Sequence, residues 1–143
     1  QIVARAQQAG LTVVSADRAS GLVTIRSDGP ALVNCGEITQ NFDGRRAKVA
    51  GEAPNAVLID FDVPGDVLLR RTSITSTATV QVRAGQPAAT VSELHEATFE
   101  QVSALGDETF YRETQAFDEA SRARFLEGTS CVSSGALRRI LRG

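Results

Sequence analysis

The chain has 143 residues, enough for one domain that buries roughly two-thirds of the surface its unfolded form exposes. Hydrophobic residues make up 42% and charged residues 22%, which argues against a disordered or fibrous chain. Fifteen basic and seventeen acidic residues give a net charge of −2, which removes the long-range attraction to phosphate that nucleic-acid-binding proteins use, so no nucleic-acid partner is expected.

The first segment predicts a short helix followed by a β-hairpin. One helical face collects four apolar residues: Ile2, Val3, Ala6 and Ala9. Gly10 follows, and glycine suits the left-handed conformation that ends many helices. Residues 11–15 and 22–26 are rich in β-branched side chains and flank SADRASG, whose Asp, Ser and Gly favour a turn.

The middle of the chain predicts strands on either side of a long connection. ALVNC at 31–35 predicts a third short strand, and the polar stretch 36–55 predicts a connection. Residues 57–63 alternate like a strand with one buried face. The alternation is clearest at 73–83, where Ser and Thr form one face of an antiparallel strand. The opposite face collects apolar residues: Ile74, Ala78, Val80 and Val82.

Residues 90–105 have two interpretations. Thr90 and Glu93 have the spacing of a capping box, and apolar residues recur with a helical period up to Gly106. Periodicity therefore favours a helix. The alternative is a strand that pairs back on residues 73–83 across the turn sequence RAGQPA.

The C-terminal part predicts a strand, an undetermined segment and a helix. Residues 109–117 alternate loosely, as a strand does, and 118–128 fit either type of element. Apolar residues three and four apart then form a helical face behind a serine cap: Leu137, Ile140 and Leu141 behind Ser133 or Ser134. Arginines suit the end of this helix: Arg138, Arg139 and Arg142. These elements predict a single α+β domain over residues 1–143, with both helices packed on an antiparallel sheet.

Two groups of titratable residues are candidates for chemistry. Asp60 and Asp62 form a DxD that could bind a divalent cation, but no second set of ligands follows, and a solvated strand face explains the pair as well. His95 is the candidate general base, flanked by Glu93 and Glu96. No GxGxxG or P-loop motif is present. We expect no catalytic residue, no metal site and no cofactor.

The two cysteines lie far apart in the sequence, and neither belongs to a CxxC pair. GTSCV around Cys131 lacks the second glycine of a nucleophile elbow, so a Cys131–His95 dyad has no nucleophile motif. Two buried thiols are one interpretation. The other is a Cys35–Cys131 disulfide, because both cysteines lie near expected element ends and closing a loop of about 100 residues stabilises a fold by about 4 to 5 kcal/mol. We expect the disulfide, which persists in an oxidising compartment.

Two stretches resemble domains of Gram-negative envelope lipoproteins. AQQAGLTVVSADRASGLVTIRS resembles the opening of BamC-like lipoprotein domains, where a helix end precedes a hairpin with this turn. CVSSGALRRIL is similar to a closing pattern of such lipoproteins, from which it departs at Ser134 and Arg138, where Thr and Glu are more usual. The resemblance covers only the two ends of the chain and transfers no catalytic residue.

This resemblance implies a periplasmic domain with helices across an antiparallel sheet, tethered to the outer membrane by a lipid upstream of Gln1. It also favours a strand over a helix at 89–103. The sequence starts with Gln1 and has no Met, so we expect a processed or trimmed product. No apolar run approaches the roughly 18 residues of a membrane helix, so membrane contact is expected only through that anchor.

Three functions follow as hypotheses. The first is a non-enzymatic adaptor that docks another envelope protein through an open sheet edge or the Ser- and Thr-rich strand. The alternative is a carrier of a small apolar ligand, a lipid or glycan, in a pocket between helix and sheet. The third is an enzyme that uses His95 or the Asp60 and Asp62 pair.

Overall fold

Two long strands form the spine of an antiparallel sheet. A computed structural model describes residues 1–28, 32–39, 46–48, 55–59, 67–103, 108–126 and 128–142. In chain order the elements are α1 Ile2–Gln8, β1 Thr12–Asp17, β2 Leu22–Ser27, β3 Val33–Asn34, β4 Glu37–Thr39, β5 Arg46–Lys48, β6 Asn55–Ile59, β7 Val67–Gln81, β8 Thr90–Ser103, β9 Thr109–Phe117, β10 Ala123–Arg124, β11 Ser130–Ser133 and α2 Ala136–Arg142. The main sheet has the order β1-β2-β7-β8-β9, with β6 also beside β7, while β10-β11-β3 and β4-β5 form smaller sheets. The chain is a single α+β domain, as the sequence predicts.

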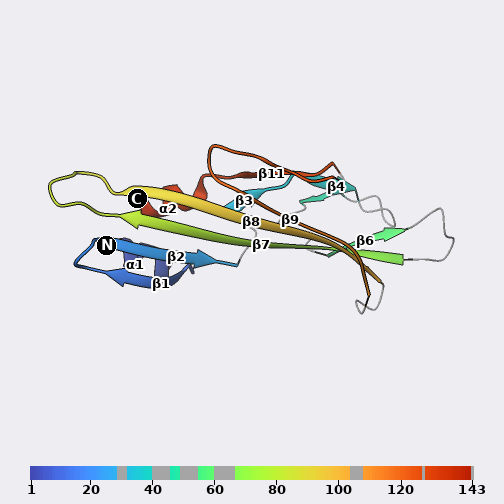
Figure 1. The fold of residues 1–143 in the computed structure, drawn as a ribbon, viewed down its shortest axis with the longest axis horizontal. Helices are drawn as coiled ribbons and strands as arrows, with labels where there is room; N and C mark the ends of the chain where they lie inside the picture. Colours follow the sequence, from blue (N-terminus) through green and yellow to red (C-terminus); the bar gives the residue numbers. More distant parts are fainter. Residues whose placement is uncertain are drawn as a thin grey trace.

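The two helices lie behind the main sheet in Figure 1, at the end of the molecule where both chain termini lie. α1 contacts α2 and β1, and α2 also contacts β8. Buried apolar side chains fill the space between helices and sheet: Ala6, Leu11, Ile25, Leu32, Ala78, Val80, Val91, Leu137 and Leu141. Within the described ranges, neither helix has the length and apolar character that crossing a bilayer requires.

Local sequence signals predict α1 and the β1–β2 hairpin correctly. Gly10 has a φ of +74°, and its N–H donates to the carbonyl of Gln7 where the helix ends. The hairpin turn is organised by Asp17, whose carboxylate accepts hydrogen bonds from Ala19 N–H at 2.9 Å and Ser20 Oγ at 2.6 Å. Asx turns of this kind explain why Asp and Ser mark turns in sequence.

Gly21 is required at the end of this turn. Its φ is +69°, and a Cβ atom there would lie 2.1 Å from the carbonyl oxygen of Val82. We expect Gly21→Ala to lower the free energy of unfolding by about 2 to 3 kcal/mol in urea titrations, because it adds backbone strain and a steric clash. Gly85→Ala is the control, since Gly85 has a φ of +78° but no atom within 4 Å of such a Cβ. Equal losses in the two variants would contradict the clash.

β7 and β8 form the long hairpin that crosses the molecule in Figure 1. The helix favoured by periodicity at 90–105 is therefore wrong, and the strand alternative is correct. Every second side chain along β8 is buried: Val91, Glu93, His95, Ala97 and Phe99. Two of these five are polar, whereas Leu94, which belongs to the helical pattern, is 56% exposed. The polar residues at buried positions hid the period of two that identifies a strand.

Two expectations before β6 need correction. The strand predicted at 31–35 is shorter, because β3 covers only Val33–Asn34 and Cys35 follows it. The stretch 36–55, expected to be a connection, contains the paired strands β4 and β5. Strands of three residues are too short for alternation to be recognised in a sequence.

The strand predicted at 57–63 begins earlier, because β6 starts at Asn55. Its described part ends at Ile59, so Asp60 and Asp62 lie outside the described residues. β6 and β2 both pair with the same edge of β7. β6 pairs with the first residues of β7, and β2 pairs with the last residues of β7. In the segment 118–128, which fits either type of element, the described residues form turns and the short strand β10.

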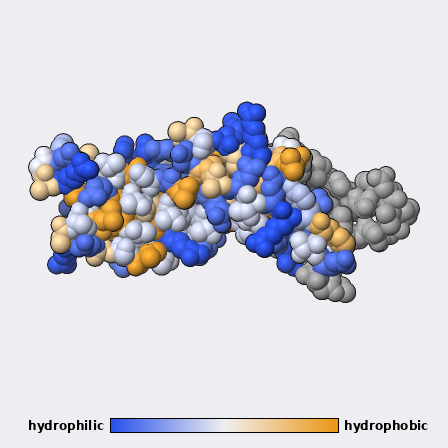
Figure 2. All heavy atoms as spheres, viewed as in Figure 1, coloured by the Kyte–Doolittle hydropathy of each residue, from blue (hydrophilic) through white to orange (hydrophobic). Residues whose placement is uncertain are grey.

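Hydroxyl side chains of β7 line the sheet face that points away from the helices. On β7 this solvated face comprises Ser73, Thr75, Thr77 and Thr79, as the alternation predicts. Val82, predicted on the buried face, lies beyond the strand and is 45% exposed, so that assignment is wrong. In Figure 2 the apolar residues on the visible face form separate small groups among hydrophilic ones.

Glu113 fastens the segment after β9 onto the sheet. Its carboxylate accepts hydrogen bonds from Tyr111 Oη, from Gln115 Nε2 at 2.7 Å and from Leu126 N–H at 3.0 Å. Gln115 Nε2 also donates to the carbonyl of Arg124 at 2.6 Å. The predicted strand at 109–117 is therefore confirmed, and its side chains hold the chain that leads to β11.

Glu113 should make stability depend on acid pH. The hydrogen bond from Tyr111 is the main cause that lowers the pKa of Glu113 below its ordinary 4.5, while burial opposes it. Because the folded pKa is the lower one, the contribution is present above the unfolded pKa and is lost as pH falls through the folded pKa. We expect wild type to be more stable than Glu113→Gln at pH 7, with the difference shrinking below about pH 4. A difference in unfolding free energy that stays constant from pH 7 to pH 3 would contradict this.

Candidate functional site

A buried cluster of polar side chains lies between the sheet and α2. Ser76 Oγ is 2.7 Å from Nδ1 of His95, and Nε2 of His95 is 3.1 Å from Oε2 of Glu93. The hydrogen bonding is complete when Nε2 carries the proton, because Nε2–H then donates to Glu93 while Nδ1 accepts from Ser76. The ring of His95 also packs against Phe117, with centroids 5.3 Å apart.

Glu93 connects this cluster to the start of α2. Its Oε2 accepts from Ser133 Oγ at 2.8 Å and its Oε1 from the N–H of Arg138 at 2.9 Å. Ser134 Oγ accepts from the N–H of Ala136 at 3.2 Å, so the serine cap predicted for this helix is confirmed. The carboxylate therefore satisfies a helix N–H that has no partner within the helix.

The order Ser, His, Glu is that of a nucleophile, a base and an acid that orients the base. Here the side chains of His95 and Glu93 are 0% exposed, and Ser76 is 1% exposed. A substrate therefore has no approach to the Ser76 hydroxyl in this arrangement. The cluster can satisfy buried polar groups, fix the register of β8 and hold α2.

The sequence predicted only part of this arrangement. His95 and Glu93 are in contact, whereas Glu96 is exposed on the opposite face of β8. Cys131 cannot serve as the thiol of a Cys131–His95 dyad, because its sulfur forms a disulfide. Ser76 was missed, since a serine in an alternating strand gives no signal of burial, and Ser133 was considered only as a helix cap and not as a partner of Glu93. Among the described residues, no group of three or more His, Cys, Asp and Glu side chains could hold a metal ion.

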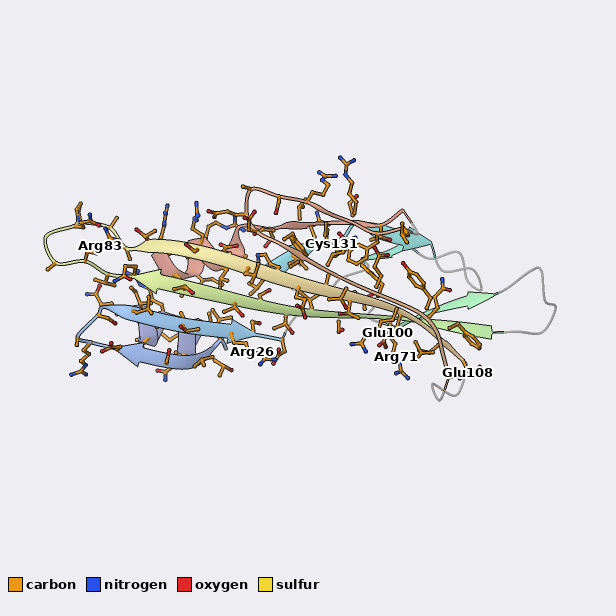
Figure 3. All side chains as sticks on the ribbon, viewed as in Figure 1. Arg26, Arg71, Arg83, Glu100, Glu108 and Cys131 are labelled. Carbon is orange, nitrogen blue, oxygen red and sulfur yellow. A yellow bond between two sulfur atoms is a disulfide. The ribbon has the colours of Figure 1, made fainter. Side chains whose placement is uncertain are left out.

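The predicted disulfide joins Cys35 and Cys131, and both cysteines are buried. It links the residue after β3 to β11, the strand that precedes α2. Three phenylalanines pack in the same core cluster: Phe99, Phe117 and Phe125. In Figure 3 Cys131 lies above β8 in this view, where β11 pairs with β3.

Two surface grooves lie at the end of the molecule where α1, the end of α2 and the β7–β8 turn meet. Their volumes are about 590 and 520 Å³. Apolar residues line the larger groove: Ile2, Val82, Pro87, Ala88, Ala89 and Leu141. The smaller groove lies between α1 and the β1–β2 hairpin and shares Gln1 and Val82 with the larger one. Val82, which is 45% exposed, therefore stands between the two grooves.

Arginines line both grooves. Arg5 and Arg142 line the larger groove, which no carboxylate lines among the described residues, and Arg18 lines the smaller one. The acid of the smaller groove, Asp17, is engaged in its own turn, where the Ser20 hydroxyl is the main cause that lowers the pKa of Asp17. Arg83 lies on the β7–β8 turn at the same end (Figure 3).

Arginines lie close to a carboxylate toward the other end of the sheet. Arg112 Nε lies 3.4 Å from Oε1 of Glu100, and Arg71 stands directly opposite Glu100 on the neighbouring strand. Figure 3 shows Arg71 and Glu100 together, far from Arg83. The lining of the larger groove differs in that it contains arginines and, among the described residues, no carboxylate. Sequence reasoning missed this site because four separate segments build it and none carries a motif.

Comparisons of the chain with protein-family models, with curated proteins and with solved structures find no match.

Proposed function

We propose that the chain is a non-enzymatic adaptor of the cell envelope, which docks another envelope protein at its grooved end. The observation that carries the proposal is the pair of grooves, which are lined by apolar residues together with arginines. Interfaces between proteins commonly combine an apolar centre with a polar rim, and arginine is enriched in them. Of the open sheet edges considered from the sequence, the one formed by β1 has less support, because β1 pairs with β2 through a register shift at Val13–Ser15, a device that discourages strand addition.

The location is part of the proposal. The Cys35–Cys131 disulfide supports an oxidising compartment, because cytosolic reductants keep most thiols reduced. The finer assignment, to the periplasm and an outer-membrane lipid anchor upstream of Gln1, rests on the resemblance of both ends of the chain to envelope lipoproteins.

Two observations favour an adaptor over the other hypotheses. The Ser76–His95–Glu93 cluster is sealed, so His95 and the hydroxyl beside it are not accessible to a substrate, and the other residues of the enzyme hypothesis, Asp60 and Asp62, lie outside the described residues. The carrier hypothesis places a lipid or glycan between helix and sheet, but buried apolar side chains fill that space. The open volume lies at the surface instead.

Site-specific photo-cross-linking tests the proposal. A photoreactive amino acid at Ala88, an exposed residue of the larger groove, is expected to capture one discrete protein in the native envelope of the producing cells. Matched controls carry it at Ala84, in the same turn but outside the grooves, and at Ala116, exposed on β9. The proposal fails if position 88 captures nothing or the three positions give the same products. Capture of a lipid or glycan alone at position 88 would favour the carrier.

A further inference from the structure

We propose that the larger groove receives an extended segment of the partner protein in which an Asp or Glu side chain stands beside apolar residues. This inference rests on the proposed function, because it names the chemistry of the partner at the same grooves. Arg5, the balance of charge and the shape of the apolar lining carry it.

The side chain of Arg5 is held in place by the end of α2 and lines the larger groove. Its Nη1 donates to the carbonyls of Leu141 at 3.2 Å and Arg142 at 2.8 Å, at the C-terminal end of α2. A guanidinium has five N–H donors in a rigid fork, and these bonds use the two of Nη1. The edge formed by Nε–H and Nη2–H has no partner among the described residues. That edge matches a carboxylate through two parallel hydrogen bonds, and the fixed side chain loses little entropy on binding.

The charge at the groove selects an acidic partner over a neutral or basic one. Arg142 adds a second positive charge to the lining of the larger groove, and its side chain has no ion-pair partner among the described residues. Asp17 in the neighbouring groove already accepts hydrogen bonds from Ala19 and Ser20. A basic segment would therefore be repelled, whereas an acidic one gains attraction.

The shape of the surface fits an extended chain. Val82 stands between the grooves, and its N–H already donates to the carbonyl of Gly21 at 2.8 Å. A partner segment that runs over Val82 would have one groove on each side. Its side chains would then enter the two grooves in turn, because successive side chains of a strand point to opposite sides. Apolar side chains would pack on Pro87 and Ala88 while the acidic side chain reaches Arg5.

A bead-bound library of acetylated random octapeptides tests the inference on the full chain. Attachment to the bead removes the free C-terminal carboxylate, so acidity can come only from Asp or Glu side chains. The peptides that bind are expected to share an Asp or Glu flanked by apolar residues. Replacing that residue by Asn or Gln in a resynthesised, amidated peptide should weaken binding about tenfold by calorimetry.

Variants locate the binding. Arg5→Lys keeps the charge but removes the forked guanidinium, and should weaken binding of the acidic peptide about tenfold. Arg142→Gln should weaken binding of this peptide several-fold without changing the fold. Arg83→Gln, a control at the same end outside the groove lining, should bind as wild type does. Ala88→Trp should block binding, whereas Ala84→Trp in the same turn should not.

Several outcomes would overturn the inference. These are binding of no peptide, enrichment of neutral or basic peptides, or acidic peptides that bind equally to Ala88→Trp. Vesicles containing phosphatidylglycerol could displace the peptide from wild type but not from Arg142→Gln. That result would identify an anionic lipid surface as the occupant of the groove instead. Cross-linking separates this inference from the proposed function. A protein captured at position 88 whose contacting segment lacks Asp and Glu would refute the inference of an acidic segment, but the proposed adaptor function would still hold. Acidic peptides without any cross-linked protein would refute the adaptor alone.

Discussion

Replacing Glu93 with alanine is expected to lower the free energy of unfolding by about 3 to 5 kcal/mol, as does removal of one partner from a buried charged network. The Glu93 carboxylate is fully buried and accepts hydrogen bonds from His95, Ser133 and the N–H of Arg138. Alanine would leave these donors inside the protein without their acceptor, at about 1 to 3 kcal/mol for each unsatisfied group. The loss would also release the first turn of α2.

Urea unfolding followed by circular dichroism measures this effect. Glu96→Ala is the matched control, because Glu96 lies on the same strand but is exposed on the other face, so a change within about 0.5 kcal/mol is expected. Hydrogen exchange tests the second part, since amides of α2 should lose more protection than those in the middle of β7. A loss below about 1 kcal/mol for Glu93→Ala would contradict the network.

The same cluster explains why β8 was the hardest element to predict. A shift of β8 by one residue would turn Leu94 inward but would also bury Ser92 and Glu96 and expose Val91, Ala97 and Phe99, so the apolar residues of β8 favour the observed register. In that register two polar residues also lie on the buried face, with His95 opposite Ser76 and Glu93 near the start of α2. These partners come from distant parts of the chain, so residues 90–103 alone do not explain why two polar side chains are buried among the apolar ones.

Elements with local causes were predictable. Gly10 ends α1 through its own left-handed conformation, and Asp17 forms the hairpin turn with Ala19 and Ser20, its neighbours in sequence. Ser134 likewise caps a helix that begins two residues later. Each signal acts within a few residues, so composition and spacing suffice to identify the element.

The grooved end was not predictable, because its geometry depends on how four segments meet. Arg5 becomes a carboxylate-binding group only when α2 places its last carbonyls against Nη1. Val82 continued the alternation of β7 and was assigned to the core, yet it lies past the end of the strand between two grooves. Such roles depend on the tertiary structure, and the order of residues in the sequence does not reveal them.

Breaking the Cys35–Cys131 disulfide is expected to lower the free energy of unfolding by about 4 to 5 kcal/mol in the chain-entropy model. The bond joins residues separated by 96 positions, so it restricts the unfolded chain strongly. Both cysteines are buried among phenylalanines, so the native packing around the sulfur atoms adds to this contribution. The double variant Cys35→Ala/Cys131→Ala should show a loss at least as large.

Urea unfolding of wild type with and without dithiothreitol measures this loss, and the double variant is the control because reductant should not alter it. A typical domain has about 5 to 15 kcal/mol of total stability, so a loss of this size would leave the reduced protein marginally folded. A protein that depends on its disulfide to this extent must fold where thiols oxidise, and this dependence would support the proposed envelope location. If reduction leaves the unfolding midpoint unchanged, the domain folds equally well in a reducing compartment, and the envelope location rests on the lipoprotein resemblance alone.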